Sequence, residues 1–574
     1  MTFVPIPLRI EAMVATAIRQ AQQDGVFPQA DYPTIPIQRS KRADQGQYSV
    51  PCMALAKSFQ MKPIDIAGVI AAGLPESELI DRTAVAPPGF LNFYISGSWI
   101  VDQLNTIIHA NQATLFQQDV GQGRLANVEF LSANPTGPLH VGRTRGAMVG
   151  DSIGRLLEAC GWKVHREYYF NNGGRQMEML GDSLRVRYLQ NLGQDVELQK
   201  DHYQGDYLVD LAQKLVEERG DTWHDKDWQP FKDYAEAQIF RMIESTLARI
   251  GIKFDLFFNE LDVYKDKSVW VVRDQLAANG HTYEAAVSEG ASEEKVQEAK
   301  QKGLEPATWF RSTSFGDNED RIIVRSNGEP TYVLPDVAYH INKLSREFDR
   351  LIDIFGSDHF IEAQTVDRAL QALGYDTSNI DVVLHQWVQL VRGGETVGMS
   401  TRSGQYVTLD DLIDEVGPDV IRYFMLDRST DREINFDLEL AVKQSNENPV
   451  YYIQNAHVRC AGIMRQVEAR GYPADWDKGA NLSLLNEEER EFIMKMLEFP
   501  EILLFAYENL APHLIATYAL DLARQFHPMY ERSRVLGEDV TEDVARARLR
   551  LYKAARLVFQ RVLTVMGMSA PETM

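Results

Sequence analysis

The chain has 574 residues, more than one hydrophobic core usually fills, so we expect two to four domains. Hydrophobic residues make up 44% of it and charged residues 25%, values that are ordinary for a soluble globular protein. No apolar run approaches the roughly 18 residues that a membrane span needs, and the N-terminus lacks a basic region followed by an apolar one. We therefore expect no membrane partner and a cytoplasmic location.

The net charge of −23 is unfavourable for a nucleic-acid-binding protein, because affinity for RNA comes largely from neutralising phosphates. Basic and acidic residues nearly balance beyond residue 441, so this region is where we expect a local basic face that could bind RNA. Arg546, Arg550 and Lys553 follow helical spacing on one face and form the candidate. The alternative is a solvated face of a bundle helix, which spacing alone favours.

Residues 1–112 mix helical patterns with a strand pattern. The helical patterns cover residues 8–22, 51–59 and 63–72, and the strand pattern covers residues 90–95. This combination predicts a small α+β domain.

Cys52, Cys160 and Cys460 lie far apart with no C-x-x-C pair, which predicts reduced, structural cysteines and no zinc motif.

Strand and helix patterns alternate in residues 113–440. Strands are predicted near residues 125–130, 164–169, 351–355 and 382–391. Such alternation favours a parallel, doubly wound sheet with ligands at the carboxyl ends of its strands. Charged, mostly helical insertions are expected within about residues 172–320, and residues 285–306 look like a surface insertion without chemistry.

The last region, residues 441–574, is predicted to be all-helical. Long amphipathic runs occupy residues 494–507, 513–526 and 543–565. No internal repeat is visible.

The most informative segment is 128–143, where a strand pattern meets a helix pattern. Asn134 to Gly137 is a dense turn signal, and a helix is predicted to begin near His140. The N-terminus of such a helix carries free N–H groups that favour a bound anion. His140 and Arg143 lie three residues apart on the first turn, so both can donate to a phosphate. The alternative is a buried histidine beside a solvated arginine.

The segment Ser132-Ala-Asn-Pro-Thr-Gly-Pro-Leu-His-Val-Gly resembles the signature turn of class I aminoacyl-tRNA synthetases. Its particular residues resemble those of the arginyl-tRNA synthetase family. In that family the turn holds ATP, and two histidines stabilise the charge that builds on the α-phosphate. His140 carries over directly. Arg143 stands where the second histidine is usual, and it keeps a donor and a positive charge.

Other segments share this resemblance over nearly the whole length. Residues 45–57 with 86–93 resemble the family's N-terminal domain, which touches the elbow of the tRNA, and residues 446–459 with 565–574 resemble its anticodon-binding domain. The implied fold is α/β: a Rossmann-like parallel-sheet catalytic domain of class I type at 113–440, an α+β domain at 1–112 and an all-α anticodon-binding bundle at 441–574.

A guanidinium substrate requires planar, bidentate acceptors, which means carboxylates held by rigid backbone. Glu129, at the end of a predicted strand, and Asp336, in the segment 330–340, fit this need. The alternatives are a strand-edge ion pair for Glu129 and a helix cap for Asp336. In the family the matching positions grip the arginine side chain.

Two further segments match family motifs. Gly356-Ser-Asp-His359 follows an apolar strand and resembles residues that line the adenosine and amino-acid pocket. Residues 397–408 resemble the loop that usually carries two lysines, but Gly398 and Thr401 stand at those positions and Arg402 is the nearby cation. We infer that Arg143, Arg402 and Mg²⁺ together neutralise the triphosphate.

The resemblance implies an ATP-dependent arginine–tRNA ligase whose partners are L-arginine, ATP and tRNA(Arg), with Mg²⁺, no resident metal site and a monomeric chain. The implied catalytic residues are His140, Arg143 and Arg402; the arginine-binding residues are Glu129, Ser132, Asn134, Tyr332 and Asp336; the ATP-binding residues are Pro138, His140, Gly142, Arg143, Asp358, His359, Met399 and Ser400.

Three alternatives remain at this stage. A catalytically weakened paralogue that binds tRNA without charging it is suggested by the absent lysines and the replaced histidine. A class I enzyme for another amino acid would leave Glu129 and Asp336 buried and unpaired. A dinucleotide-binding oxidoreductase lacks support, because no G-x-G-x-x-G follows the first strand of the α/β region.

Overall fold

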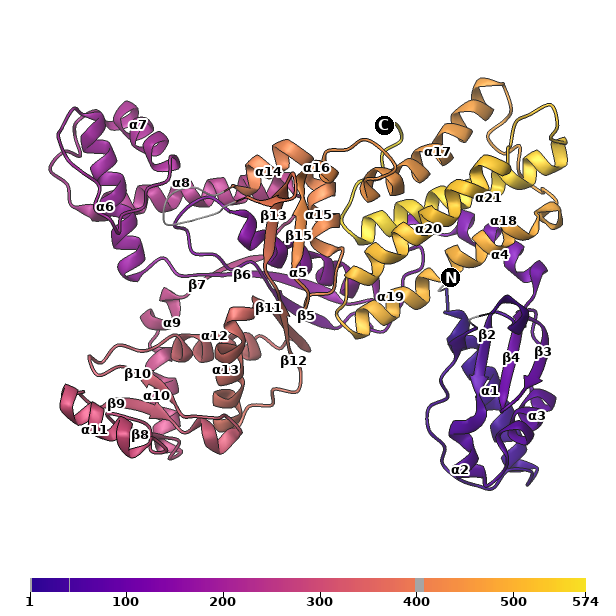
Figure 1. Ribbon diagram of the computed structural model, residues 1–574, viewed down its shortest axis with the longest axis horizontal. Helices are drawn as coiled ribbons and strands as arrows, with labels where there is room; N and C mark the ends of the chain where they lie inside the picture. The colour runs from indigo at the N-terminus through magenta and orange to yellow at the C-terminus, as the bar shows by residue number, and fades with distance from the viewer. Residues whose placement is uncertain (1–2, 41, 398–406) are drawn as a thin grey trace. The chain divides into compact units, whose positions relative to one another are not determined.

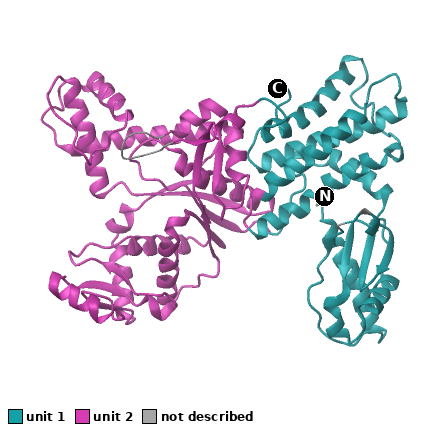
Figure 2. Ribbon diagram, in the orientation of Figure 1, with its two compact units in different colours: residues 1–120, 444–509, 514–574 teal, residues 121–443, 510–513 magenta. Residues whose placement is uncertain are grey.

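The computed structural model describes residues 3–40, 42–397 and 407–574 (Figure 1). The chain divides into two compact units: residues 121–443 with 510–513, and residues 1–120 with 444–509 and 514–574 (Figure 2). Every helix in the described part of the chain is too short or too polar to span a bilayer.

The core of unit 2, residues 121–443 with 510–513, is a five-stranded sheet in which all neighbouring strands run parallel, as the alternating pattern predicted. The strands β6 and β7 follow one another on one side of β5, whereas β11 and β12, which come later in the chain, lie on its other side. The order therefore reverses between β5 and β11, which is the position where doubly wound sheets bind their ligands. The strands are β5 (Leu125–Glu129), β6 (Lys163–Phe170), β7 (Leu256–Asn259), β11 (Arg350–Gly356) and β12 (Ile380–His385).

Helix α5 (Val141–Ala159) follows β5 and packs closely on the sheet. A Cβ atom at Gly150 would lie 2.2 Å from the Phe130 ring, and one at Gly146 would lie 2.8 Å from Nε2 of His385. Glycine at these two positions therefore lets the helix backbone approach the sheet.

The fully buried Arg145 fixes the same helix to later segments of the chain. Its guanidinium group donates to the backbone oxygens of Gln386 at 2.9 Å, Arg432 at 2.6 Å and Ser429 at 2.9 Å. Burial lowers the pKa of Arg145 to about 10.

The single strand predicted at residues 382–391 is wrong, because the structure has two strands in different sheets. β12 ends at His385, and β13 (Val388–Arg392) pairs with β15 (Ile434–Asp437) and β14 (Glu395–Thr396). Gln386 lies between them, and its backbone N–H donates to the oxygen of Thr430 at 2.9 Å instead of continuing a ladder. A continuous apolar pattern does not reveal such a change of partner.

The range predicted to hold helical insertions, 172–320, also contains β7 of the central sheet and two of the three strands of a small antiparallel sheet. The helices α6 (Gly174–Asn191), α7 (Tyr207–Arg219) and α8 (Trp228–Arg249) pack together before β7. The small sheet consists of β8 (Thr282–Ala285), β9 (Ala307–Phe310) and β10 (Arg321–Val324). In residues 285–306 only α11 (Glu293–Lys302) is helical, because Ala285 still belongs to β8.

This unit contains seven further α-helices among the described residues. They are α9 (Leu261–Lys265), α10 (Ser268–Ala278), α12 (Val333–Ser345), α13 (Phe360–Ala372), α14 (Leu409–Val416), α15 (Pro418–Leu426) and α16 (Leu438–Ala441).

Unit 1 begins with an antiparallel sheet of order β1-β2-β4-β3, which confirms an α+β module. The helix predicted over 51–59 is shorter than expected, because Pro51 belongs to a strand and a 3₁₀ turn precedes α2. The elements are α1 (Ile6–Gln23), β1 (Gln38–Arg39), β2 (Tyr48–Pro51), α2 (Ala56–Phe59), α3 (Pro63–Gly73), β3 (Ile80–Ala86), β4 (Phe90–Ile95) and α4 (Gly97–His109).

The last part of the chain is helical, as predicted. The run at 494–507 is interrupted at Glu498, because Pro500 has no backbone N–H and starts a new helix better than it continues one. The helices are α17 (Pro449–Ala469), α18 (Glu487–Leu497), α19 (Phe499–Glu508), α20 (His513–Arg532) and α21 (Glu542–Val565).

The candidate basic face on α21 is wrong, because its three cations bind the chain itself. Arg546 donates to the backbone oxygens of Trp476 and Lys478, both at 2.8 Å. Arg550 pairs with Asp477 at 3.0 Å, and Lys553 pairs with the same carboxylate. These side chains fix the loop after α17, so they are neither a phosphate-binding face nor a freely solvated one.

We predict that Asp477→Ala destabilises this bundle, because it leaves two cations without their buried acceptor. Asp477 is 2% exposed, so the free energy of unfolding should fall by about 3 kcal/mol. Denaturant unfolding measures the loss. The exposed neighbour Asp475 is the matched control, and equal stability of the Asp477→Ala and Asp475→Ala variants would contradict this assignment.

Candidate active site

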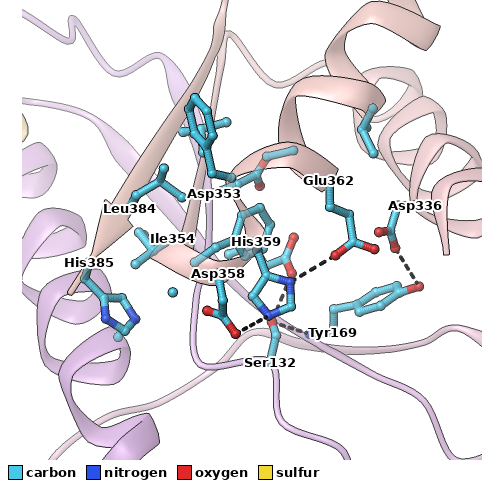
Figure 3. Close-up of a pocket in the computed structure, with 18 of the residues that line it drawn as sticks. Ser132, Tyr169, Asp336, Asp353, Ile354, Asp358, His359, Glu362, Leu384 and His385 are labelled. Atoms are coloured by element: carbon cyan, nitrogen blue, oxygen red, sulfur yellow. Dashed lines mark hydrogen bonds and ion pairs between the residues drawn. The ribbon is translucent and has the colours of Figure 1, made fainter. Parts of the chain in front are cut away.

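A cavity of about 1140 Å³ lies at the carboxyl ends of β5, β6, β11 and β12, at the switch point of the sheet. Figure 3 shows part of its lining. Of the predicted site residues that the structure describes, all except Pro138 line this cavity. Pro138 lies half-buried in the turn before α5. Met399, Ser400 and Arg402 lie outside the described residues. The lining residues are Glu129, Ser132, Asn134, His140, Gly142, Arg143, Tyr332, Asp336, Asp358 and His359.

The turn after β5 has an unusual backbone at the edge of this cavity. Leu131 and Ser132 have φ angles of 70° and 41°, a region that side chains other than glycine rarely adopt. The N–H of Ser132 donates to the oxygen of Phe130 at 2.9 Å and closes the tight turn. The Ser132 hydroxyl donates to Oε1 of Glu129 at 2.9 Å and accepts from the N–H of Tyr169 at 3.2 Å. These contacts hold the strained backbone in one conformation.

Asn134 continues this turn and ties it to the segment after β6. Its Oδ1 accepts from the N–H of Asn171 at 2.9 Å, and its Nδ2 donates to Oε1 of Gln176 at 3.4 Å. The hydroxyl of Tyr168 donates to the oxygen of Ala133 at 2.8 Å. The turn is therefore fixed by side chains of β6 and α6 before any ligand binds.

Helix α5 begins directly after His140, close to the predicted start, and Arg143 lies in its first turn. His140 itself was predicted on that turn, but it is the N-cap residue and has an extended backbone. Burial and the nearby Arg143 guanidinium lower the pKa of His140, so its imidazole is neutral at neutral pH. The backbone N–H groups of Val141 and Arg143 already have acceptors, so the attraction for an anion comes from the positive end of the helix dipole and from the Arg143 guanidinium group.

The chain returns to this helix start just after residue 406. The N–H of Leu409 donates to the oxygen of Leu139 at 2.7 Å, and the N–H of Val141 donates to the oxygen of Val407 at 3.3 Å. Thr408 caps α14 through a capping box with Asp411. Val407 and Thr408 are thus fixed beside the candidate phosphate site.

Beneath the cavity, Lys343 is completely buried between two carboxylates. Its ammonium group donates to Oε2 of Glu129 and, at 2.5 Å, to Oδ1 of Asp353. Both oxygens of Glu129 are therefore engaged, one by Lys343 and one by Ser132. The ion pair considered for Glu129 exists, but it lies in the centre of the sheet and not at an edge.

Sequence reasoning missed Lys343 and its second partner, Asp353. A signal was present, because Asp336, His340 and Lys343 recur at helical spacing and share one face of α12. His340 connects the same elements. Its Nδ1 contacts the backbone oxygen of Asp336 at 2.7 Å, and its Nε2 contacts the carboxylate oxygen Oδ2 of Asp353 at 3.0 Å.

Asp336 and Glu260 also line the cavity, and their electrostatic surroundings differ from those of Glu129. Within the described residues neither forms an ion pair, although Glu260 is only 5% exposed. Burial raises the pKa of both carboxyls, and the neighbouring carboxylates Glu362, Glu260 and Glu129 raise that of Asp336 further. Glu260 was not predicted from the sequence. The arrangement favours a cationic ligand group, which would relieve this repulsion.

His359 lies between two carboxylates at the end of β11 (Figure 3). Its Nδ1 lies 3.0 Å from Oε2 of Glu362, and its Nε2 lies 3.8 Å from Oδ2 of Asp358. The hydrogen bond to Glu362 raises the pKa of His359. At the end of β12, burial lowers the pKa of His385 to about 4, so this second imidazole is neutral.

Tyr332, predicted to bind substrate, is 62% exposed at the start of α12 and lines the rim of the cavity. In residues 3–40, 42–397 and 407–574, no group of three or more His, Cys, Asp or Glu side chains is arranged to hold a metal ion.

A parallel sheet with a fixed turn and a helix start at its switch point defines a nucleotide-binding catalytic domain of the class I synthetase type. Residues 103–437 match the model of the class I tRNA synthetase (R) catalytic domain, residues 9–95 match the arginyl tRNA synthetase N-terminal domain, and residues 453–574 match the DALR anticodon binding domain.

Proteins of similar sequence agree with these matches. An arginine–tRNA ligase of Desulfotalea psychrophila is 42% identical over 94% of each chain, and one of Desulforamulus reducens is 38% identical over 97% of each chain. The structure of Thermus thermophilus arginyl-tRNA synthetase has the same fold, with a TM-score of 0.73 and 20% identity over 99% of this chain and 100% of that one. The chain belongs to the arginyl-tRNA synthetase family.

We predict that Lys343→Met strongly destabilises the catalytic domain, because Glu129 and Asp353 would remain buried without their shared cation. The expected loss is about 3–5 kcal/mol in the free energy of unfolding. Thermal and denaturant unfolding measure it. Lys302→Met, which removes an exposed helical ion pair on α11, is the control and should cost less than about 1 kcal/mol. A similar stability for both variants would contradict the assigned role of Lys343.

Proposed function

We propose that this protein is an arginine–tRNA ligase. It activates L-arginine with ATP to arginyl-adenylate, and then transfers the arginyl group to the 3′-terminal adenosine of tRNA(Arg). The observation that carries this proposal is a pair of carboxylates, the half-buried Asp336 and the buried Glu260, in the same cavity as the α5 helix start. The described residues provide no ion-pair partner for either of them. One side of the cavity suits a cation and the other suits a polyphosphate.

In the first step an arginine carboxylate oxygen attacks the α-phosphate of ATP. A bond forms between that oxygen and phosphorus, and the bond to the bridging oxygen breaks, so pyrophosphate leaves. The protein contributes positioning and charge stabilisation, with no covalent nucleophile. We assign the stabilisation of the phosphates to the imidazole N–H of His140, the guanidinium group of Arg143 and the start of α5. Arg402 is assigned to the same task as a prediction from sequence.

Arginine recognition is assigned to the acidic side of the cavity. Asp336 provides a planar acceptor for the guanidinium group, Glu129 supports the turn, and Tyr332 closes the rim. Ser132 and Asn134 are assigned to the amino and carboxylate ends of the substrate. For ATP we retain Pro138, Gly142, Asp358, His359, Met399 and Ser400 as predictions.

Mg²⁺ fits this arrangement as a companion of ATP. Magnesium usually binds substrate phosphates and water and needs few protein ligands, which agrees with the donor set around this cavity. The bound ion would supply further neutralisation of the triphosphate charge. The residues that adjoin the phosphates, Arg143 and His140, orient them whether or not the ion is present.

The second step uses the ribose hydroxyl of the terminal tRNA adenosine as nucleophile. Its oxygen attacks the arginyl carbonyl carbon, and AMP leaves with the bond electrons. We further propose domains at 1–112, 113–440 and 441–574, of which the first and last bind the tRNA, and a cytoplasmic monomer.

The test is arginine-dependent release of pyrophosphate from ATP by the full chain, with and without tRNA(Arg). Release with arginine, and none with lysine or citrulline, is expected. Asp336→Ala should abolish release while tRNA binding, measured by filter retention, stays close to wild type. Tight tRNA binding without any release by the wild-type protein would make the chain a binding paralogue. Selective loss of tRNA binding in Asp336→Ala would overturn the role of Asp336.

The raised pKa of Asp336 predicts a pH dependence of arginine use. The unprotonated carboxylate binds the guanidinium cation, and this ability is lost as the pH falls through the raised pKa. In kcat/KM for arginine, which reports the free enzyme, the acidic limb should therefore lie well above the range of an ordinary aspartate. A pH series at saturating ATP measures it. An acidic limb at the ordinary aspartate range would contradict this prediction.

A further inference from the structure

The Ser132 hydroxyl group lines the cavity beside Tyr169 and keeps one hydrogen-bonding capacity for a ligand (Figure 3). It donates its proton to Oε1 of Glu129 at 2.9 Å, and its oxygen accepts from the backbone N–H of Tyr169 at 3.2 Å. A hydroxyl group has one proton and two acceptor lone pairs. Ser132 therefore keeps one lone pair and no proton for a ligand, which makes it an acceptor that suits an ammonium group.

Glu129 fixes this polarity, because it accepts the Ser132 proton and has none to give in return. Burial raises the pKa of Glu129, but the ammonium group of Lys343, which donates to its Oε2, opposes this effect and favours the ionised form. An ionised carboxylate is an acceptor only. Glu129 is 2% exposed, so it offers a ligand almost no surface of its own, and its influence reaches the cavity through Ser132.

Asn134, two residues further along the turn, has the opposite polarity. Its Oδ1 accepts from the backbone N–H of Asn171 at 2.9 Å, so its Nδ2 carries the two protons, one of which is donated to Gln176. The other proton remains for a ligand. An acceptor at Ser132 together with a donor at Asn134 matches the ammonium and carboxylate groups of an amino acid.

We propose that Glu129 is a positioning residue for the α-amino group of arginine: it takes the proton of Ser132 and thereby presents the Ser132 oxygen as the acceptor for the substrate ammonium group. This inference rests on the proposed function. It assigns Glu129 and Asp336 to different ends of the substrate, although both are carboxylates that line one cavity. Asp336 remains assigned to the guanidinium group.

The substitution Glu129→Gln reverses the polarity of Ser132. The glutamine carbonyl group becomes the acceptor for Lys343, so its NH₂ group donates to the Ser132 oxygen. That oxygen then accepts from both the glutamine and the Tyr169 N–H, and its own proton turns towards the substrate ammonium group. We expect the KM for arginine to rise about ten- to a hundredfold, the range for a hydrogen bond to a charged group.

Two arginine analogues locate the effect at one end of the substrate. Agmatine keeps the amino and guanidinium groups, whereas δ-guanidinovalerate lacks the amino group and keeps the guanidinium group. Each is measured as a competitive inhibitor of arginine-dependent pyrophosphate release by the full chain with tRNA(Arg). In Glu129→Gln the inhibition constant of agmatine should rise about ten- to a hundredfold, and that of δ-guanidinovalerate less than about threefold.

Ser132→Ala tests the same inference without changing a charged residue. It removes the acceptor for the ammonium group, so arginine and agmatine should bind about tenfold more weakly, while the binding of δ-guanidinovalerate stays unchanged. Adding Glu129→Gln to Ser132→Ala should cause no further difference between the two analogues, because Glu129 acts through the hydroxyl group. This cycle separates positioning from a general loss of stability.

The matched control is Glu167→Gln. Glu167 lies opposite Glu129 in the register of β5 and β6, is fully buried and pairs with Arg346, but it does not line the cavity. This variant should keep the wild-type KM for arginine and both inhibition constants. Equal weakening of the two analogues in Glu129→Gln, or no change in either, would overturn this inference alone. Absence of arginine-dependent pyrophosphate release in the wild type would overturn the proposed function itself.

Discussion

The ammonium group of Lys343 is the interaction on which the site depends. It comes from α12 and joins the carboxyl-terminal halves of β5 and β11, the two strands between which the sheet changes direction. A fully buried cation is costly unless its partners are close, and here two carboxylates share it. The consequence is electrostatic as well as mechanical. Because Lys343 and Ser132 engage both oxygens of Glu129, the carboxylates that remain for a cationic ligand are Asp336 and Glu260.

The two sides of the cavity are therefore built by different means. The proposed phosphate side relies on backbone: a strained turn, a helix start and the return of the chain at Val407 and Thr408. The acidic side relies on side chains from several strands and helices, which are linked by hydrogen bonds. A preorganised site of this kind does not have to rearrange when charge develops in the reaction.

Local patterns predicted the parallel sheet, the strand-turn-helix unit at 125–159 and most helices, because these depend on neighbouring residues. The same patterns failed where partners are distant: residues 382–391 divide between two sheets, and Arg546, Arg550 and Lys553 bind a loop that precedes them by about seventy residues. Glu129 and Asp336, which line the cavity, were predicted because a carboxylate suits a guanidinium group and because their segments resemble those of the family. Glu260 and Lys343 were missed because their roles arise only from tertiary contact.

Helix α5 has a consequence for the order in which the protein can assemble during synthesis. Glycine weakens a helix by about 1 kcal/mol per residue, and α5 contains Gly142, Gly146, Gly150 and Gly154, so it cannot rely on its own propensity. Its stability comes from packing on Phe130 and from Arg145, whose acceptors end at Arg432. A nascent chain on the ribosome therefore cannot make all the contacts of Arg145 until Arg432, nearly three hundred positions further along, has emerged.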